Sequence, residues 1–153
     1  HSGYKIIGTY INSTMALHEA LAKGADEALL LDKNGYISEG SGENIFIVKD
    51  NKINTPKTDH CLNGITRQSV IKIAEDFGFE VTEKDITYEE LVSSDEVFFT
   101  GTAVEITPIY KVDEILIGTG SIGPITEKLQ TTYGDIVSGR NNLYKNWLTI
   151  VSD

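Results

Sequence analysis

Residues 35–48, GYISEGSGENIFIV, constrain the fold more than any other stretch of this sequence. They join two strand-like runs through a segment with three glycines and two carboxylates, and we expect a hairpin here. Glycine lets a backbone bend or approach a ligand closely, where a side chain would collide. Glu39, at the end of the first run, therefore points either into a crowded pocket or, as a solvated acid, into water. This stretch alone leaves both interpretations open.

Length and composition indicate one globular domain. With 153 residues, of which 40% are apolar and 24% charged, the chain can bury about two thirds of its unfolded surface. The net charge of -10 argues against nucleic acid or a membrane surface as a partner. No apolar run approaches the roughly 18 residues of a membrane span. The single cysteine and the absence of a signal peptide predict a reducing, cytoplasmic compartment.

Apolar spacing and helix-breaking residues predict four helices. Glycine or a polar cap marks most of their ends, and proline can occupy the first turn. The expected helices are one from Asn12 or Ser13 to about Lys23, with Ala16, Leu17, Ala20 and Leu21 on one side and Gly24 as its end; one from Gly64 to Gly78, with Val70, Ile73, Ala74 and Phe77 on one side; a short one over 87–91; and one that starts at Pro124, with Ile125, Leu129 and Tyr133 inward.

Strand-like runs outnumber these helices and do not alternate strictly with them. We therefore expect an α+β fold, a mixed sheet or pseudo-barrel flanked by helices. The expected strands are a buried one over 27–32, then 36–38, 44–49, 52–55, 79–82, 96–100 and 105–112, the last with Pro108 at an edge or bulge.

Metal and hydrolase chemistry have weak support in the sequence. The three histidines, His1, His18 and His60, have no ligand spacing, and Cys61 has only His60 as a neighbour. A structural or surface role is the better interpretation of each. Ser41 lies between glycines but lacks the Gly-x-Ser-x-Gly spacing of a nucleophile elbow.

Two glycine turns could bind anions. Residues 63–67 lead into a helix, whose free N–H groups and dipole, with the Thr66 hydroxyl, suit a phosphate. Residues 100–103 offer two hydroxyls and closely spaced amides at a strand end, suited to phosphate or carboxylate. A plain helix cap and an ordinary strand connection are the alternatives. Neither turn has the spacing of a Walker loop or a dinucleotide fingerprint.

Lys5 lies in an apolar N-terminal run, residues 4–10. A lysine in such a run is usually a solvated charge whose aliphatic stem packs against its neighbours. The alternative is a partly desolvated amine that acts as a nucleophile and bonds covalently to an aldehyde. The sequence by itself leaves both interpretations open.

Taken together, these segments resemble the branched-chain-amino-acid aminotransferases, which belong to the fold-type IV pyridoxal-phosphate enzymes. The shared segments stand in the family's order and spacing and span most of the chain: residues 5–10, 38–46, 62–67 and 95–108. The resemblance implies the fold-type IV C-terminal domain, the cofactor pyridoxal 5'-phosphate, and amino transfer between branched-chain L-amino acids and 2-oxoglutarate. It also implies a homo-oligomer. Residues 101–108 favour the branched-chain group over other fold-type IV enzymes.

The resemblance implies a role for each matched residue. Lys5 matches the lysine that binds the cofactor covalently and moves a proton. Glu39 matches the carboxylate that faces the pyridine nitrogen, and Tyr10 the phenol at the ring oxygen. The remaining matches are Leu62 against the ring; Gly64, Ile65 and Thr66 around the phosphate, with a hydroxyl from Thr102; and Gly101, Thr102 and Ala103 at the substrate carboxylate.

Two departures from the family stand out. Asn63 replaces the family's usual proline, which should alter only loop stiffness. Family chains are about twice as long, and the N-terminal domain missing here supplies an arginine for the phosphate and part of the substrate pocket. We therefore expect residues 4–153 to be the cofactor-binding C-terminal domain, poorly active alone and with an exposed apolar face, and residues 1–3 to be a possible tag remnant. The alternatives are a D-amino-acid aminotransferase or an inactive cofactor-binding or assembly module.

Overall fold

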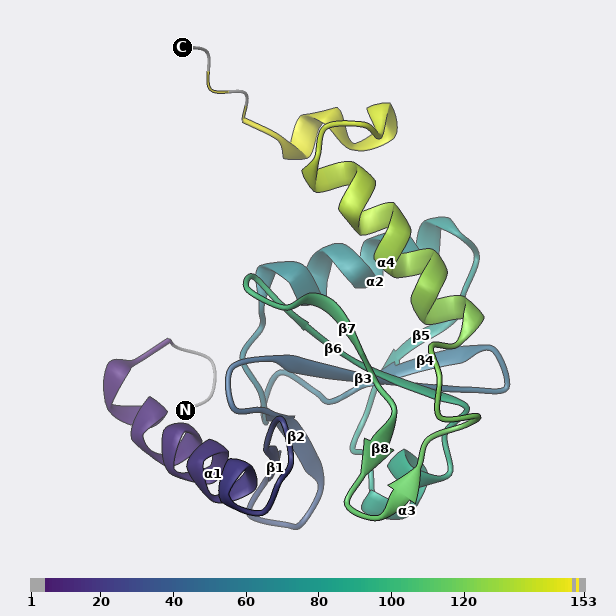
Figure 1. Ribbon diagram of the computed structural model, residues 1–153. Helices are drawn as coiled ribbons and strands as arrows, with labels where there is room; N and C mark the ends of the chain where they lie inside the picture. The colour runs from purple at the N-terminus through teal and green to yellow at the C-terminus, as the bar shows by residue number, and fades with distance from the viewer. Residues whose placement is uncertain (1–4, 150, 152–153) are drawn as a thin grey trace.

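Strand β3 (Asn44–Lys49) is the centre of a five-stranded sheet in the computed structural model, which describes residues 5–149 and 151 (Figure 1). Antiparallel neighbours lie on both sides of it, β4 (Lys52–Thr55) and β6 (Glu96–Gly101). One edge is β5 (Val81–Glu83), parallel to β4, and the other is β7 (Glu105–Ile109). The sheet is mixed, as predicted, and Pro108 lies in an edge strand.

The apolar run of β3 explains its central position. Successive strand side chains point to opposite faces, so a strand without polar alternation has to be covered on both. Phe46 and Val48 belong to one core cluster, and Ile45 and Ile47 to the other, each at most 2% exposed. The Phe46 ring stacks on that of Phe98 in β6, with centroids 5.1 Å apart. The sheet is therefore the middle layer between two cores.

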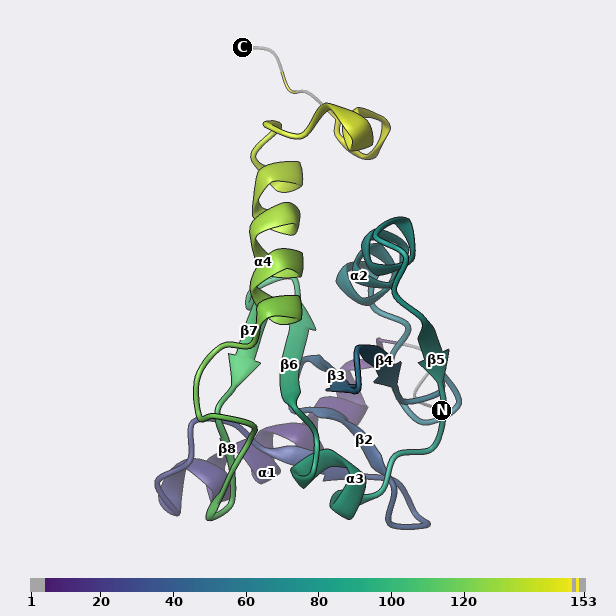
Figure 2. The same ribbon diagram turned by 90° about the vertical axis from the view of Figure 1, so that its right-hand side faces the viewer.

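Helices α2 (Ile65–Asp76) and α4 (Pro124–Val137) cover one face of this sheet (Figures 1 and 2). Their predicted inner residues are buried or pack against the core, with one exception. Phe77 lies just beyond the end of α2 and is 38% exposed, with the Lys128 ammonium 3.9 Å from its ring centroid. Gly78, with φ of 82°, ends the helix as predicted.

The remaining elements, apart from a short 3-10 helix η2 (Asn142–Trp147) after α4, lie on the other side of the sheet (Figure 2). The described elements there are α3 (Tyr88–Val92), the ribbon of β1 (Leu29–Leu31) and β2 (Ile37–Gly40), α1 (Tyr10–Ala22) preceded by η1 (Ile7–Thr9), and the small pair β8 (Lys111–Val112) and β9 (Ile115–Leu116). Helices on both sides of a mixed sheet confirm the α+β prediction.

The hairpin predicted over 35–48 is wrong. β2 pairs with β1, where Leu30 lies opposite Glu39, whereas β3 pairs with β4 and β6. The Gly40 N–H donates to the Glu43 carbonyl over 2.7 Å, and at this turn the chain passes from one sheet to the other. A Cβ on Gly40 would lie 2.7 Å from Glu43 Oε2 and 3.0 Å from the Phe99 ring, so only glycine fits this crossing.

The start and the apolar side of the first helix also differ from the prediction. η1 continues directly into α1, so the helix begins at Tyr10, and Asn12 and Ser13 lie in its first turn rather than at its cap. Among its described side chains α1 buries none, and Leu21 is 52% exposed. The apolar spacing predicted the helix correctly, but no described element covers that side.

Three predicted strands are shorter or displaced. The strand expected over 27–32 is reduced to β1, which is only partly buried, because its partner is the short β2 rather than the main sheet. The run 105–112 divides at Tyr110 into β7 and β8, which belong to different sheets. β5 begins two residues later than the expected strand over 79–82.

A carboxylate from the sheet anchors α4. Glu96, at the start of β6, is 7% exposed and accepts hydrogen bonds from Ile125 N at 3.1 Å and from Thr126 N and Oγ1 at 2.7 and 2.6 Å. The N-cap residue of the helix, Gly123, has no side chain for this purpose, and a Cβ there would lie 2.1 Å from the Glu96 carboxyl carbon. Glu96 thus replaces the usual local N-cap.

The substitution Glu96→Ala should lower the free energy of unfolding by about 3 kcal/mol, because two buried amides and a hydroxyl lose a charged partner. Urea unfolding of the 153-residue chain measures this loss, provided that the m value is unchanged. Glu127→Ala is the matched control, since Glu127 is exposed in the first turn of the same helix. Equal losses in the two variants would contradict the anchoring role.

Candidate functional site

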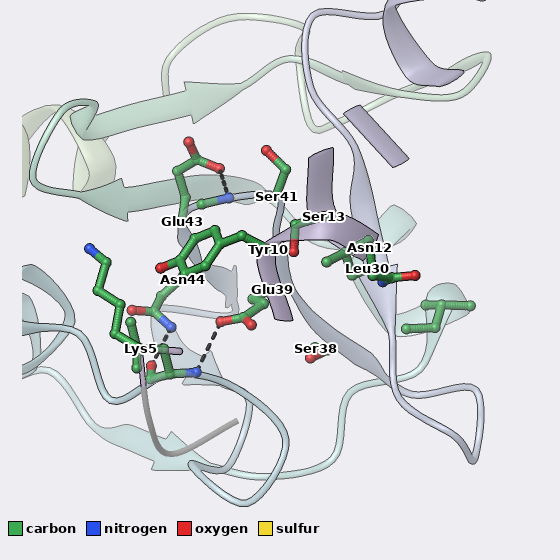
Figure 3. A pocket seen from close by; sticks show the side chains of 13 residues that line it. Lys5, Tyr10, Asn12, Ser13, Leu30, Ser38, Glu39, Ser41, Glu43 and Asn44 are labelled. Atoms are coloured by element: carbon green, nitrogen blue, oxygen red, sulfur yellow. Dashed lines mark hydrogen bonds between the residues drawn. The ribbon is translucent and has the colours of Figure 1, made fainter. Parts of the chain in front are cut away.

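A cavity of about 280 Å³ lies between the start of α1, the β1–β2 ribbon and the loop before α2 (Figure 3). Four residues that the resemblance assigned to the site line it, namely Lys5, Tyr10, Glu39 and Leu62. They come from three separate segments of the sequence, and only the tertiary fold brings them together. The cavity decides between the two interpretations of Glu39, because its side chain faces an enclosed space rather than open water.

Glu39 is held by the backbone of the neighbouring loop. Its Oε2 accepts a hydrogen bond from Leu62 N over 2.9 Å, and Oε1 accepts none from the described residues. Burial raises the pKa of the Glu39 carboxyl, and the Leu62 N–H opposes that shift by stabilising the anion. The site thus contains a carboxylate with a fixed orientation and one oxygen available to a cationic or N–H partner.

Lys5 and Tyr10 come from the two ends of the short η1 segment. Tyr10 is half-buried as the first residue of α1, and the hydroxyl end of its ring points toward Lys5 (Figure 3). The Lys5 side chain is exposed at the edge of the cavity. Of the two interpretations of Lys5, the described residues therefore support the exposed amine, since nothing among them removes it from solvent.

Two further lining residues, Glu43 and Asn44, were missed as site residues by sequence reasoning. Burial raises the pKa of the Glu43 carboxyl, and the nearby charges of Glu27 and Glu39 raise it further, against a stabilising hydrogen bond from Gly42 N at 3.0 Å. The only signal for both was their position beside the three glycines. With three carboxylates nearby, the interior of the cavity favours a cation or a hydrogen-bond donor.

The turn at the start of α2 lies beside the cavity rather than in its lining. Gly64 is the N-cap without a capping side chain, and Ile65 is 82% exposed. Thr66 is 4% exposed, and its hydroxyl lies 3.4 Å from that of Tyr133 in α4. Leu62, two residues before Gly64, connects this helix start to the cavity. The roles predicted for Gly64, Ile65 and Thr66 stay predictions.

The turn after β6 lies against the glycine crossing. A Cβ on Gly101 would lie 3.5 Å from Glu43 Cγ and 3.7 Å from the Gly42 carbonyl oxygen, so the two turns are in contact. Thr102 and Ala103 are exposed and do not line the cavity. Their predicted contacts with substrate and phosphate likewise stay predictions, made by residues at the rim of the site.

His60 and Cys61 serve as structural residues beside the site. The His60 ring nitrogens lie 3.3 Å from Asp32 and 3.6 Å from Asp85, and burial raises the pKa of the Cys61 thiol to about 11. Within residues 5–149 and 151, no group of three or more His, Cys, Asp or Glu side chains could hold a metal ion. None of the described helices is long and apolar enough to cross a bilayer.

Residues 1–112 match the family model described as amino-transferase class IV. The chain belongs to the class IV aminotransferases. It is 55% identical over 144 residues to the branched-chain-amino-acid aminotransferase of Pseudomonas aeruginosa, covering 94% of this chain and 47% of that protein. This class IV chain thus spans about half the length of the curated relatives it matches.

Solved structures agree with this assignment and with the predicted fold-type IV domain. A thermophile branched-chain amino acid aminotransferase complexed with N-(5'-phosphopyridoxyl)-L-glutamate superimposes with a TM-score of 0.96 at 48% identity, over 99% of this chain and 51% of that one. The PLP-form enzyme from Thermobaculum terrenum gives a TM-score of 0.91 at 41% identity, over 95% and 48%. The similarity covers nearly all of this class IV chain.

The substitution Glu43→Gln should raise the melting temperature of the cofactor-free chain at pH 7. The raised pKa means that folding favours the protonated acid, so the buried charge destabilises the fold once the pH exceeds the folded-state pKa. The gain should therefore shrink as the pH falls through that value. Thermal melts between about pH 4 and pH 8 test this, with the exposed Glu89→Gln as control. A gain that does not depend on pH would contradict it.

Proposed function

We propose that this chain is the cofactor-binding C-terminal half of a branched-chain-amino-acid aminotransferase. The convergence of Lys5, Tyr10, Glu39 and Leu62 on one cavity carries the proposal. The names of the relatives support it, and solved neighbours were studied with a phosphopyridoxyl glutamate, with 4-methylvaleric acid and with norvaline. In the full-length protein, pyridoxal 5'-phosphate would serve amino transfer between leucine, isoleucine or valine and 2-oxoglutarate.

The described residues fit pyridoxal 5'-phosphate. Its aldehyde needs a primary amine, its ring nitrogen an acceptor, and its phosphate several donors. Lys5 supplies an accessible amine at the rim, and Glu39 an oriented carboxylate with a free oxygen. The first-turn amides of α2 have no capping side chain, so they remain available to an anion. Leu62 would pack against the ring, and Thr102 would add a hydroxyl.

The chemistry divides between the cofactor and the residues that surround it. When bound, pyridoxal phosphate supplies an aldehyde that condenses with amines and a ring that takes up electron density. The Lys5 amine holds this aldehyde and then removes and returns the proton at the substrate Cα. Glu39 keeps a proton on the ring nitrogen, because an adjacent anion favours the charged form. Tyr10 donates to the ring oxygen, and the backbone of residues 101–103 binds the substrate carboxylate.

The remaining half of the full-length protein is the partner that this proposal requires. The N-terminal helix exposes Ile7, Ile11 and Met15 by 89%, 67% and 68%, and four-residue spacing places these side chains on one side. Such a stripe is costly in water, so a covering surface from the missing N-terminal half is expected. That half would also desolvate Lys5. Assembly as a homo-oligomer and location in the cytoplasm remain predictions.

Lys5→Ala should abolish covalent capture of pyridoxal 5'-phosphate by the full-length protein. The wild type should gain an absorbance band near the visible edge, and borohydride reduction followed by peptide mass analysis should find the adduct on Lys5. Lys33→Ala is the control, since Lys33 is equally exposed in a turn away from the cavity. A wild-type protein that never forms the adduct would support the non-enzymatic alternative, a binding or assembly module.

The full-length protein should turn over L-valine at least about tenfold faster than D-alanine, judged by kcat/KM with 2-oxoglutarate. A D-amino-acid aminotransferase of the same fold type needs its side-chain and carboxylate pockets exchanged, and tenfold corresponds to about 1.4 kcal/mol of transition-state binding. The measurement uses the same enzyme preparation for both substrates. Preference for D-alanine would favour the alternative enzyme and leave the cofactor site unchanged.

A further inference from the structure

The peptide of Leu62 is held from both sides by side chains of two different strands. Glu39 in β2 accepts its N–H over 2.9 Å, and Asn44 in β3 donates from Nδ2 to its carbonyl over 2.6 Å. Asn44 is 6% exposed, so this hydrogen bond is shielded from water. The loop before α2 is therefore fixed at one peptide, directly between the carboxylate of the site and the helix start.

The same asparagine also contacts the helix cap. Its Oδ1 lies so close to Gly64 that a Cβ built there would be 2.4 Å away. Gly64 has φ of -64° and ψ of 147°, which any residue adopts, so its backbone does not require glycine. The requirement comes from the Asn44 side chain, which occupies the space where a Cβ would stand.

A second side chain holds the rest of the loop independently. Arg67 in α2 is 1% exposed and donates to the Pro56 carbonyl at 2.9 Å and to Asn63 Oδ1 at 3.4 Å, and it pairs with Glu83 at 2.7 Å. Both ends of the loop are thus tied to the helix. Asn44 is the contact that ties Leu62 and Gly64 to the sheet.

We propose that Asn44 is a positioning residue that sets the separation between Glu39 and the first turn of α2. This inference rests on the proposed function, in which Glu39 faces the ring nitrogen and the helix start holds the phosphate. A ligand that has both a ring nitrogen and a phosphate depends on that separation. Pyridoxal, which lacks the phosphate, has only the ring end to satisfy.

The test compares pyridoxal 5'-phosphate with pyridoxal in equilibrium titrations of the full-length protein, followed by absorbance. Asn44→Ala should weaken binding of the phosphate form by about tenfold and that of pyridoxal by less than about threefold, tenfold being the loss of about 1.4 kcal/mol, one hydrogen bond. A purely structural role would lower the melting temperature and weaken both ligands equally. Asn54→Ala, in β4 and outside the cavity lining, is the matched control.

A double-mutant cycle tests the contact itself. Gly64→Ala alone should weaken binding of the phosphate form by about tenfold, because its Cβ collides with Asn44 Oδ1. In the Asn44→Ala background the same change should cost less than about threefold, since the colliding atom is gone. Independent, additive losses would overturn the proposal.

The outcomes separate this inference from the function on which it rests. A wild-type protein that binds neither ligand would overturn the proposed function and the role of Asn44 with it. A wild type that binds both, with equal weakening in Asn44→Ala, would overturn the role of Asn44 alone. If Asn44→Ala does not fold, Gly64→Ala decides by itself: a selective loss for the phosphate form supports the proposal, and equal losses overturn it.

Discussion

Burial of β3 on both faces is the constraint on which the rest of the structure depends. A strand that alternates large apolar side chains between two cores cannot shift by one residue without exchanging those cores. Its register therefore fixes where Asn44, its first residue, ends the strand, and so fixes the position of the loop that Asn44 holds. The precision of the site thus derives from the packing of Phe46 and its neighbours rather than from the loops themselves.

The polar frame around the loop adds orientation to this register. Asn44, Glu39 and Arg67 all contact backbone groups of the loop, and backbone groups cannot be moved by a change of rotamer. Side chains that hold a peptide plane therefore transmit the rigidity of the sheet and the helix to a segment without regular structure. This explains why so few residues of the loop need to be large or apolar.

The sequence predicted local elements well and their partners less well. Both ends of α2 follow from Gly64 and Gly78, because helix capping is a local property. The hairpin failed because glycine in the crossing allowed the chain to change sheets, and sheet choice depends on distant strands such as β6. Lys5, Tyr10, Glu39 and Leu62 could be grouped only by resemblance. Glu43 and Asn44 were missed because their role depends on which loops the fold brings beside them.

Charge decides how a phosphorylated cofactor could be arranged in this site. The cavity lies among Glu27, Glu39 and Glu43, and two of these carboxyls already have a raised pKa. A phosphate placed in the cavity would face like charges at short range, where repulsion is strong because little water screens it. Its favourable position is the α2 start, beyond Leu62, where the helix dipole and free amides attract it. The loop that separates the two regions is therefore also the spacer that keeps phosphate and carboxylates apart.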